Sequence, residues 1–246
     1  MPNYKLTIQY EGTRYKGWQA QKTTDATIQG KIQRVLEKMS GEDIDLQGSG
    51  RTDAGVHAKA QIAHFHMKAL GDTKQIKEYL NTYLPEDIVI KKVEMVDERF
   101  HARLHAKSKT YEYRIYKGAK PDAFERRYVV PLEETLDVAQ MKKAASYLEG
   151  THDFNAFCGN RRMKKSTVRT IFKIEIKECE EEIRLRFTGS GFLQNMVRIL
   201  TGTLVEVGKG EKKAEDMELI LESRDRQKAG SLMPAKGLTL IEVVYK

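Results

Sequence analysis

The chemistry and the fold of this chain centre on one stretch, Gly48-Ser49-Gly50-Arg51-Thr52-Asp53-Ala54-Gly55-Val56-His57-Ala58. Its three glycines within eight residues indicate backbone conformations that side chains obstruct, or a close approach by another group. Among them lie a guanidinium, a hydroxyl and a carboxylate, and an imidazole follows. Two interpretations fit these residues: a glycine-rich hairpin in which Asp53 bonds its own backbone, and a catalytic loop on a rigid sheet.

Segments of regular pattern flank this stretch on both sides. The patterns predict strands at 4–10, 44–47, 60–66 and 88–96, and helices at 28–39 and 73–84. Thr27 is the expected N-cap and Gly41 the expected stop of the first helix. The element order is βαββαβ, which is the ferredoxin-like arrangement.

The pattern then begins again. Strands are predicted at 110–116, 170–176, 183–187 and 238–245, and helices at 138–148, 192–205 and 214–221. This is a second βαββαβ order with insertions, although no direct sequence repeat is visible. We therefore predict an α+β fold of two ferredoxin-like halves, residues 1–107 and 108–246, joined into one extended, mainly antiparallel sheet. Helices would cover one face of that sheet, and a cleft would cross the other.

Composition excludes several classes of protein. With 246 residues, 40% hydrophobic and 32% charged, the chain is expected to be soluble and globular. No apolar run approaches the roughly 20 residues that span a bilayer, and the N-terminus lacks the apolar core of a signal peptide. Cys158 and Cys179 form no CxxC and no metal spacing, so a cytoplasmic, reducing compartment is predicted.

The positive charge is clustered. The net charge is +8 and the pI is about 9.2, which favours a polyanionic partner. Between residues 99 and 120, Glu112 is the only acid, and the basic residues are Arg99, Arg103, Lys107, Lys109, Arg114, Lys117 and Lys120. A second, acid-free stretch at 154–174 holds Arg161, Arg162, Lys164, Lys165, Arg169 and Lys173. Clustering of this kind suits a groove that follows phosphates, and nucleic acid is favoured over membrane because no basic amphipathic helix is present.

Arg198 is the only charge among the apolar residues 191–200. An arginine in such a helix either extends to solvent at the helix edge or pairs with a carboxylate. Asp53 in the first half is a candidate partner, and a guanidinium beside it would keep that carboxylate ionised at neutral pH. Tyr111 also has two interpretations, a packed aromatic of the sheet or a ring that stacks on an unpaired base.

Metal binding is not predicted. His64 and His66 share one strand face, and His101 and His105 have i, i+4 spacing, but neither pair has further ligands at diagnostic spacing. The phosphate-binding motifs GxxxxGK[ST] and GxGxxG and the nucleophile motif GxSxG are absent from the sequence.

Taken together, the motifs resemble one enzyme family. Residues 50–58 resemble the signature of the TruA family of tRNA pseudouridine synthases. Further matching segments follow in the same order along nearly the whole chain: Tyr10-Glu11-Gly12, Gly17-Trp18, Phe100-His101-Ala102-Arg103, Lys109-Thr110-Tyr111-Glu112-Tyr113, Gly150-Thr151-His152-Asp153-Phe154, residues 192–198, Gly202-Thr203-Leu204 and Gly237-Leu238-Thr239-Leu240.

The resemblance implies a reaction and a substrate. The family isomerises uridine to pseudouridine at positions 38, 39 and 40 in the anticodon stem-loop of tRNA, without cofactor or metal. The N1–C1′ bond breaks, the base turns, and C5 bonds to C1′. The cleft would then be a basic RNA-binding cleft, and the enzyme a homodimer in which one tRNA touches both subunits.

The resemblance also implies the roles of five residues. Asp53 matches the catalytic aspartate, which either attacks C1′ or removes a ribose proton. Arg198 matches the arginine that pairs with it, and Tyr111 the tyrosine that stacks on the base. Leu240 would form an apolar shelf on the other side of the base, and Arg51 would insert into the RNA stack where the uridine leaves.

Two other classes of function stay open at this point. A non-catalytic RNA-binding module fits the basic and aromatic residues but gives no reason for Asp53 and Arg198. A metal-dependent nuclease would combine Asp53 with His57, His64 or His66.

Overall fold

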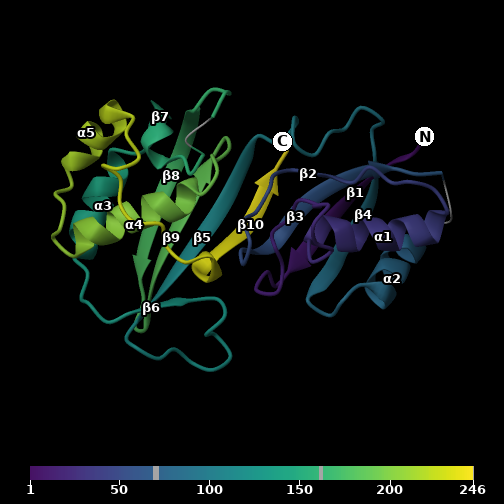
Figure 1. The fold of residues 1–246 in the computed structure, drawn as a ribbon, viewed down its shortest axis with the longest axis horizontal. Helices are drawn as coiled ribbons and strands as arrows, with labels where there is room; N and C mark the ends of the chain where they lie inside the picture. The colour runs from purple at the N-terminus through teal and green to yellow at the C-terminus, as the bar shows by residue number, and fades with distance from the viewer. Residues whose placement is uncertain (69–71, 161–162, 246) are drawn as a thin grey trace. The chain divides into compact units, whose positions relative to one another are not determined.

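The computed structural model describes residues 1–68, 72–160 and 163–245, and the chain divides into two compact units (Figure 1). The first unit comprises Met1–Lys107 together with Leu240–Lys246, and the second comprises Ser108–Thr239. Both units combine helices with a mainly antiparallel sheet, which confirms the α+β class predicted from the sequence. Residues from Leu240 onward belong to the first unit, whereas the sequence-based division at 107/108 assigned them to the second half.

The first unit has the βαββαβ order expected of a ferredoxin-like half. Its elements are β1 (Asn3–Tyr10), α1 (Ile28–Ser40), β2 (Gln47–Gly48), β3 (His57–His66), α2 (Thr73–Tyr83) and β4 (Ile88–Val96). β1 lies between β3 and β4 and pairs antiparallel with both, and β2 pairs antiparallel with β3. The buried Leu6 of β1 faces Ala63 on one side and Val93 on the other, so this strand forms the centre of the core.

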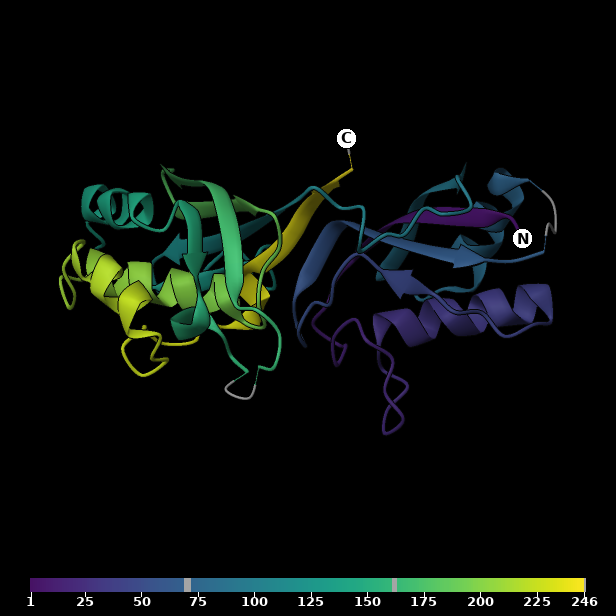
Figure 2. The ribbon, with the colours of Figure 1, turned by 90° about the horizontal axis from the view of Figure 1, so that it is seen from above.

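Local sequence determines both ends of α1. The Thr27 side chain accepts a hydrogen bond from the Gly30 amide at 3.3 Å, which satisfies a free N–H of the first turn. Gly41 ends the helix at φ 71°, a left-handed conformation that favours glycine. Both predicted caps are confirmed. Figure 2 shows α1 running along one face of the strands of this unit, where it buries its apolar residues Ile28, Ile32 and Leu36.

From β5 to β10 the chain repeats the order with insertions, and all of these elements except most of β10 belong to the second unit. Its elements are β5 (Ser108–Lys117), β6 (Val130–Leu132), α3 (Val138–Ser146), β7 (Gly150–Asp153), the 3-10 helix η1 (Asn155–Phe157), β8 (Val168–Glu178), β9 (Glu182–Gly189), α4 (Met196–Gly208), α5 (Asp216–Ser223) and the 3-10 helix η2 (Ala235–Gly237). β5, β9, β8 and β7 are antiparallel neighbours in that order, and the short β6 runs parallel to β5. α3 packs on α4 and on β8. The last strand, β10 (Leu238–Val244), follows η2.

Many predicted boundaries shift by one to three residues, and two differences have a cause that the structure shows. The strand expected at 44–47 is reduced to Gln47–Gly48, because side chains of α1 bind its backbone: Gln33 donates to the Ile44 carbonyl at 2.6 Å and Gln29 to the Leu46 carbonyl at 2.7 Å. The helix expected from residue 192 begins only at Met196, because Asn195 lies in the left-handed region at φ 61° and cannot continue a helix. The short strands β6 and β7 were not predicted from the sequence.

His64 gives this fold a dependence on pH. It lies in β3, is 5% exposed, and its Nδ1 accepts a hydrogen bond from the Ala102 amide at 3.2 Å. Burial lowers the pKa of His64 below its usual value, and the nearby His101 and His66 lower it further. The ring centroids of His64 and His101 are 4.7 Å apart. The folded state therefore favours the neutral imidazole.

The free energy of unfolding is expected to fall as the pH drops below about 6.5, the usual histidine pKa, because the unfolded chain then binds a proton that folded His64 resists. Urea denaturation at pH 7.5 and pH 5.5 measures this difference. His64→Gln keeps a hydrogen-bond acceptor but does not titrate, so the difference should shrink. His105→Gln, at an exposed position, is the control. An equal pH dependence in the wild type and in His64→Gln would contradict the expectation.

Candidate active site

The glycine-rich loop at residues 49–56 is fixed to β3 where it begins. The Ser49 amide donates to the Ile62 carbonyl at 2.7 Å, and the Ser49 hydroxyl donates to Oε1 of Gln61 at 2.7 Å. The amide nitrogen of Gln61 donates to the Gly50 carbonyl at 3.1 Å. Gln61 is fully buried. One buried glutamine thus holds two successive residues of the loop just before Arg51.

The segment from Tyr10 to Trp18 holds the middle of the loop. The hydroxyl oxygens of Tyr10 and Thr52 are 2.8 Å apart in the interior, and the Trp18 amide donates to the Thr52 carbonyl at 3.0 Å. Gly17 has φ +96°, and a Cβ at that position would lie 2.7 Å from the Thr52 carbonyl oxygen. Position 17 therefore requires glycine, because of both its positive φ and the contact that a Cβ would make with the Thr52 carbonyl oxygen. The backbone directly before Asp53 is therefore held in one position.

His57 and Gly12 hold the end of the loop. His57 is 2% exposed, and its Nδ1 accepts a hydrogen bond from the Gly12 amide at 3.0 Å and lies 3.4 Å from Oε1 of Glu11. A Cβ on Gly12 would lie 2.0 Å from the Val56 carbonyl oxygen, so the two backbones touch. His57 therefore helps to hold the end of the loop in place.

The loop presents two of the predicted site residues. Asp53 is half-buried, and its carbonyl accepts a hydrogen bond from the Val56 amide at 3.2 Å, which closes a tight turn. Arg51 is exposed. Leu240, in β10, belongs to the same unit and is 1% exposed. A carboxylate on a fixed backbone and an accessible guanidinium thus lie two residues apart in one loop.

The second unit holds Tyr111 and Arg198. Tyr111 lies in β5, is 8% exposed, and makes an edge-to-face contact with Phe192 at a centroid distance of 5.3 Å. Arg198 is half-buried near the start of α4. Its Nε donates to the Met233 carbonyl at 2.7 Å and its Nη1 to Oδ1 of Asn195 at 3.3 Å. The guanidinium is therefore anchored by protein groups, unlike that of an arginine extended freely into solvent.

Sequence reasoning missed the groups that orient Arg198. Asn195 has φ 61°, and a non-glycine residue in that region stores strain that often serves a site. Asparagine tolerates this conformation better than most residues, which is the one signal the sequence offers. Nothing in the sequence marks the Met233 carbonyl, which is 35 residues away from Arg198.

Ion pairs occupy part of the basic run predicted from the sequence. Arg114 pairs with Glu182 and, at 2.7 Å, with Glu125, and Lys117 pairs with Glu178 at 3.2 Å. Because these two cations are already paired with carboxylates, they offer less positive charge to a polyanion than unpaired cations would. Arg161 and Arg162, which belong to the second basic stretch, lie outside the described residues.

Neither a metal-binding cluster nor a membrane span is found in the part of the chain that the structure describes. Within residues 1–68, 72–160 and 163–245, no group of three or more His, Cys, Asp or Glu side chains could hold a metal ion. Over the same ranges, no helix has the length and apolar character needed to cross a membrane.

Comparison with known proteins identifies the class of enzyme. A family model described as tRNA pseudouridine synthase matches residues 6–104 and 144–246. A fold of two α+β units with this match is that of a pseudouridine synthase, which is an isomerase. The chain belongs to the tRNA pseudouridine synthase family.

Full-length relatives refine this assignment. The chain is 46% identical over 245 residues to a tRNA pseudouridine synthase A 2 of Bacillus cereus, covering 100% of both chains. It is 48% identical to tRNA pseudouridine synthase A of a Bacillus species, covering 98% of both, and 47% identical to tRNA pseudouridine synthase A 1 of Clostridium tetani, covering 100% of both. These matches confirm the resemblance to the TruA family.

A solved structure of a Cbf5-Nop10-Gar1 complex is also similar, with a TM-score of 0.36 and 11% identity. The match covers 96% of this chain and 57% of that chain. A likeness at this level carries no argument about function.

Proposed function

We propose that this protein converts uridine to pseudouridine at positions 38, 39 and 40 in the anticodon stem-loop of tRNA, with Asp53 as the catalytic carboxylate and without a cofactor. The observation that carries the proposal is the placement of Asp53 in a loop whose backbone is bound before and after it. Family membership adds the substrate class, and the relatives named above are tRNA pseudouridine synthases A.

The reaction requires little from the protein beyond a negatively charged carboxylate in the correct position. Uridine and pseudouridine are isomers, so no atom is gained or lost and no electron acceptor is required. The N1–C1′ bond breaks, the base turns within the site, and C5 bonds to C1′ before C5 loses its proton. The Asp53 carboxylate either attacks C1′ or removes a ribose proton. Both routes depend on a carboxylate held close to the sugar, and a fixed loop supplies this without further ordering.

Four other residues would complete the site around the substrate. Tyr111 is proposed to stack on the base, and Leu240 to form the apolar surface on its other side. Arg51 is proposed to occupy the space that the uridine leaves in the RNA stack when it flips out. Flipping a nucleotide costs a few kcal/mol. The exposure of Arg51 supports that role. Arg198 is proposed to orient the Asp53 carboxylate by ion pairing. The defined orientation of its guanidinium supports this role.

The roles of the two halves, the tRNA-binding residues, the compartment and the oligomeric state are proposed on the same basis. The first half would carry the catalytic loop and the second half Tyr111 and Arg198, and tRNA would bind along basic residues. The enzyme would act in the cytoplasm as a homodimer.

Mapping of pseudouridine in an unmodified tRNA transcript incubated with the purified protein tests the proposal. Pseudouridine is expected at positions 38, 39 and 40 wherever the transcript carries uridine, with equal yield in EDTA. A non-catalytic RNA-binding module would bind the transcript without forming pseudouridine. A metal-dependent nuclease would cleave the transcript and lose that activity in EDTA. Modification confined to other positions would contradict the proposed specificity.

A further inference from the structure

The connection between β5 and β6, residues 118–129, extends away from the strands of the second unit (Figure 1). It lies outside the residues matched by the family model, 6–104 and 144–246. Phe124 in this loop is 87% exposed, the largest exposed fraction among the large apolar side chains of the described residues. Single exposed apolar residues are common on protein surfaces, so exposure alone indicates no function.

The loop around Phe124 is ordered by its own hydrogen bonds. The carboxylate of Asp122 accepts a hydrogen bond from the Phe124 amide at 2.7 Å, and the Asp122 carbonyl accepts from the amides of Glu125 and Arg126 at 3.1 Å and 2.9 Å. These bonds form a compact turn with Phe124 at its tip. A backbone ordered in this way loses little conformational freedom when a side chain at its tip binds a partner.

Two contacts tie this turn to the rest of the unit. The guanidinium of Arg114, which lies in β5, pairs with the Glu125 carboxylate at 2.7 Å. The ammonium group of Lys236 lies 3.4 Å from the Arg126 carbonyl oxygen, to which it donates. Arg114 is itself anchored to Glu182 of β9, so the tip is connected to two strands of the sheet.

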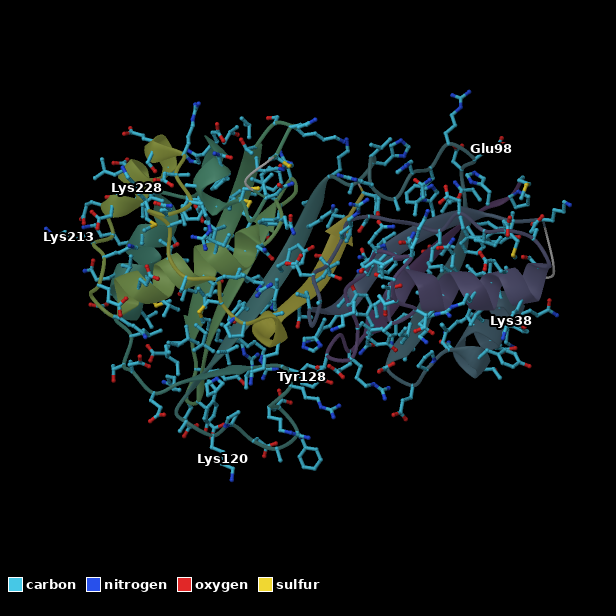
Figure 3. All side chains as sticks on the ribbon, viewed as in Figure 1. Lys38, Glu98, Lys120, Tyr128, Lys213 and Lys228 are labelled. Carbon is cyan, nitrogen blue, oxygen red and sulfur yellow. The ribbon has the colours of Figure 1, made fainter. Side chains whose placement is uncertain are left out.

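The loop that carries Phe124 is rich in basic residues. Lys120, Arg126 and Arg127 are exposed in the same loop, and Figure 3 shows Lys120 extending away from it. The two acids of the loop face other groups, since Asp122 caps the turn and Glu125 pairs with Arg114. The Arg126 guanidinium donates to the Ala123 carbonyl, next to Phe124 in the chain. Exposed cations before and after an exposed aromatic residue in one loop suit single-stranded RNA, which binds with its phosphates on cations and its bases on aromatic rings.

We infer that Phe124 stacks on an unpaired base of the tRNA substrate, while Lys120 and Arg126 bind the adjacent phosphates. This inference rests on the proposed function for the identity of the RNA. It assigns a tRNA contact to a loop beyond the residues shared with the family model.

Binding of an unmodified tRNA transcript to loop variants is the first test. Phe124→Ala is expected to raise the Kd about 5- to 150-fold, the range for one lost base–aromatic stack. Phe124→Leu keeps an apolar side chain without an aromatic face and should behave like Phe124→Ala, whereas Phe124→Tyr should bind like the wild type. Tyr83→Ala removes another exposed aromatic ring, at the end of α2 and outside both basic stretches, and is the control.

Fluorescence provides a second, direct test. The only tryptophan of the chain, Trp18, is 1% exposed, so it should respond little to RNA bound at the surface. Phe124→Trp places a second indole at the loop tip, where stacking on a base should quench its emission when the transcript is added. Tyr83→Trp, at an exposed position outside both basic stretches, should show no such quenching.

Three results would overturn the inference. The first two are a Kd within about twofold of the wild type for Phe124→Ala and an absence of quenching in Phe124→Trp. The third is a change of sedimentation coefficient in Phe124→Ala without RNA, because the ring would then contact a second copy of the chain. If the wild type modifies tRNA at the proposed positions while Phe124→Ala binds normally, only this inference fails. If the wild type forms no pseudouridine there, the proposed function fails, and the binding data still decide whether Phe124 stacks on RNA.

Discussion

Asp53→Asn is expected to lower the rate of pseudouridine formation by about 1,000-fold or more, while the Kd for tRNA changes by less than about threefold. Asparagine has nearly the size of aspartate and keeps one oxygen acceptor. It lacks the negative charge, so it can neither attack C1′ nor remove a ribose proton. Because the loop backbone is held by Gln61, Trp18 and Tyr10, the substitution should leave the loop in place. Single-turnover tritium release from [5-³H]uridine tRNA and a filter-binding assay measure the two quantities.

The matched control for this experiment is Asp43→Asn. Asp43 precedes the same loop and is exposed, so the same change of charge should leave the rate of the reaction unaltered. A second variant, Arg198→Met, tests the proposed ion pair. If Arg198 acts only through Asp53, the double variant should be no slower than Asp53→Asn alone. Near wild-type pseudouridine formation by Asp53→Asn would remove Asp53 from the mechanism.

The parts of the fold that the sequence predicts well are those determined by neighbours along the chain. α1 is the clearest example, since Thr27 binds the Gly30 amide three residues later and Gly41 supplies a left-handed turn at the other end. The strand β4 was predicted with its observed bounds for a similar reason, because Pro85 and the alternating residues that follow define it locally.

The parts that the sequence predicts poorly are determined by distant residues. The segment 44–46 has the residues of a strand, but its carbonyls bind Gln29 and Gln33 of α1, and no local pattern reveals that choice. The start of α4 depends on Asn195, whose left-handed backbone is accompanied by a contact with Arg198. Apolar periodicity extends through residues 192–195 and therefore predicts helix where the structure has none.

The candidate site likewise contains residues that the sequence reveals and residues that only the structure reveals. Asp53 and Arg198 stand out in the sequence as charges in a glycine-rich and an apolar setting, and Tyr111 as an aromatic beside a basic run. The roles expected of Arg51 and Leu240 came only from the resemblance to the family. The groups that hold the site residues were not visible. The Tyr10 hydroxyl, the Gln61 amide and the Met233 carbonyl are ordinary residues or backbone atoms whose importance comes from where the fold puts them. Their roles emerge only from the structure.

Gly12→Ala is expected to be among the most damaging single-methyl changes in the first unit. The added Cβ would lie 2.0 Å from the Val56 carbonyl oxygen and 2.6 Å from its carbon, both backbone atoms that cannot rotate away. Moving them displaces the loop end and weakens the hydrogen bond from the Gly12 amide to His57. The free energy of unfolding should fall by about 2–4 kcal/mol, within the range for steric overpacking. Urea denaturation measures that loss.

The same substitution should also slow catalysis, because Val56 is three residues from Asp53 and their backbones are hydrogen-bonded. A displacement of about 1 Å at a catalytic group costs about 100-fold in rate. Activity must therefore be measured at a temperature where the variant is fully folded, so that loss of rate and loss of folded protein are separated. Gly191→Ala is the control, since no described atom lies within 4 Å of its added Cβ. If Gly12→Ala were as stable and as active as Gly191→Ala, the backbone contact at Gly12 could not be what holds the Asp53 loop in position.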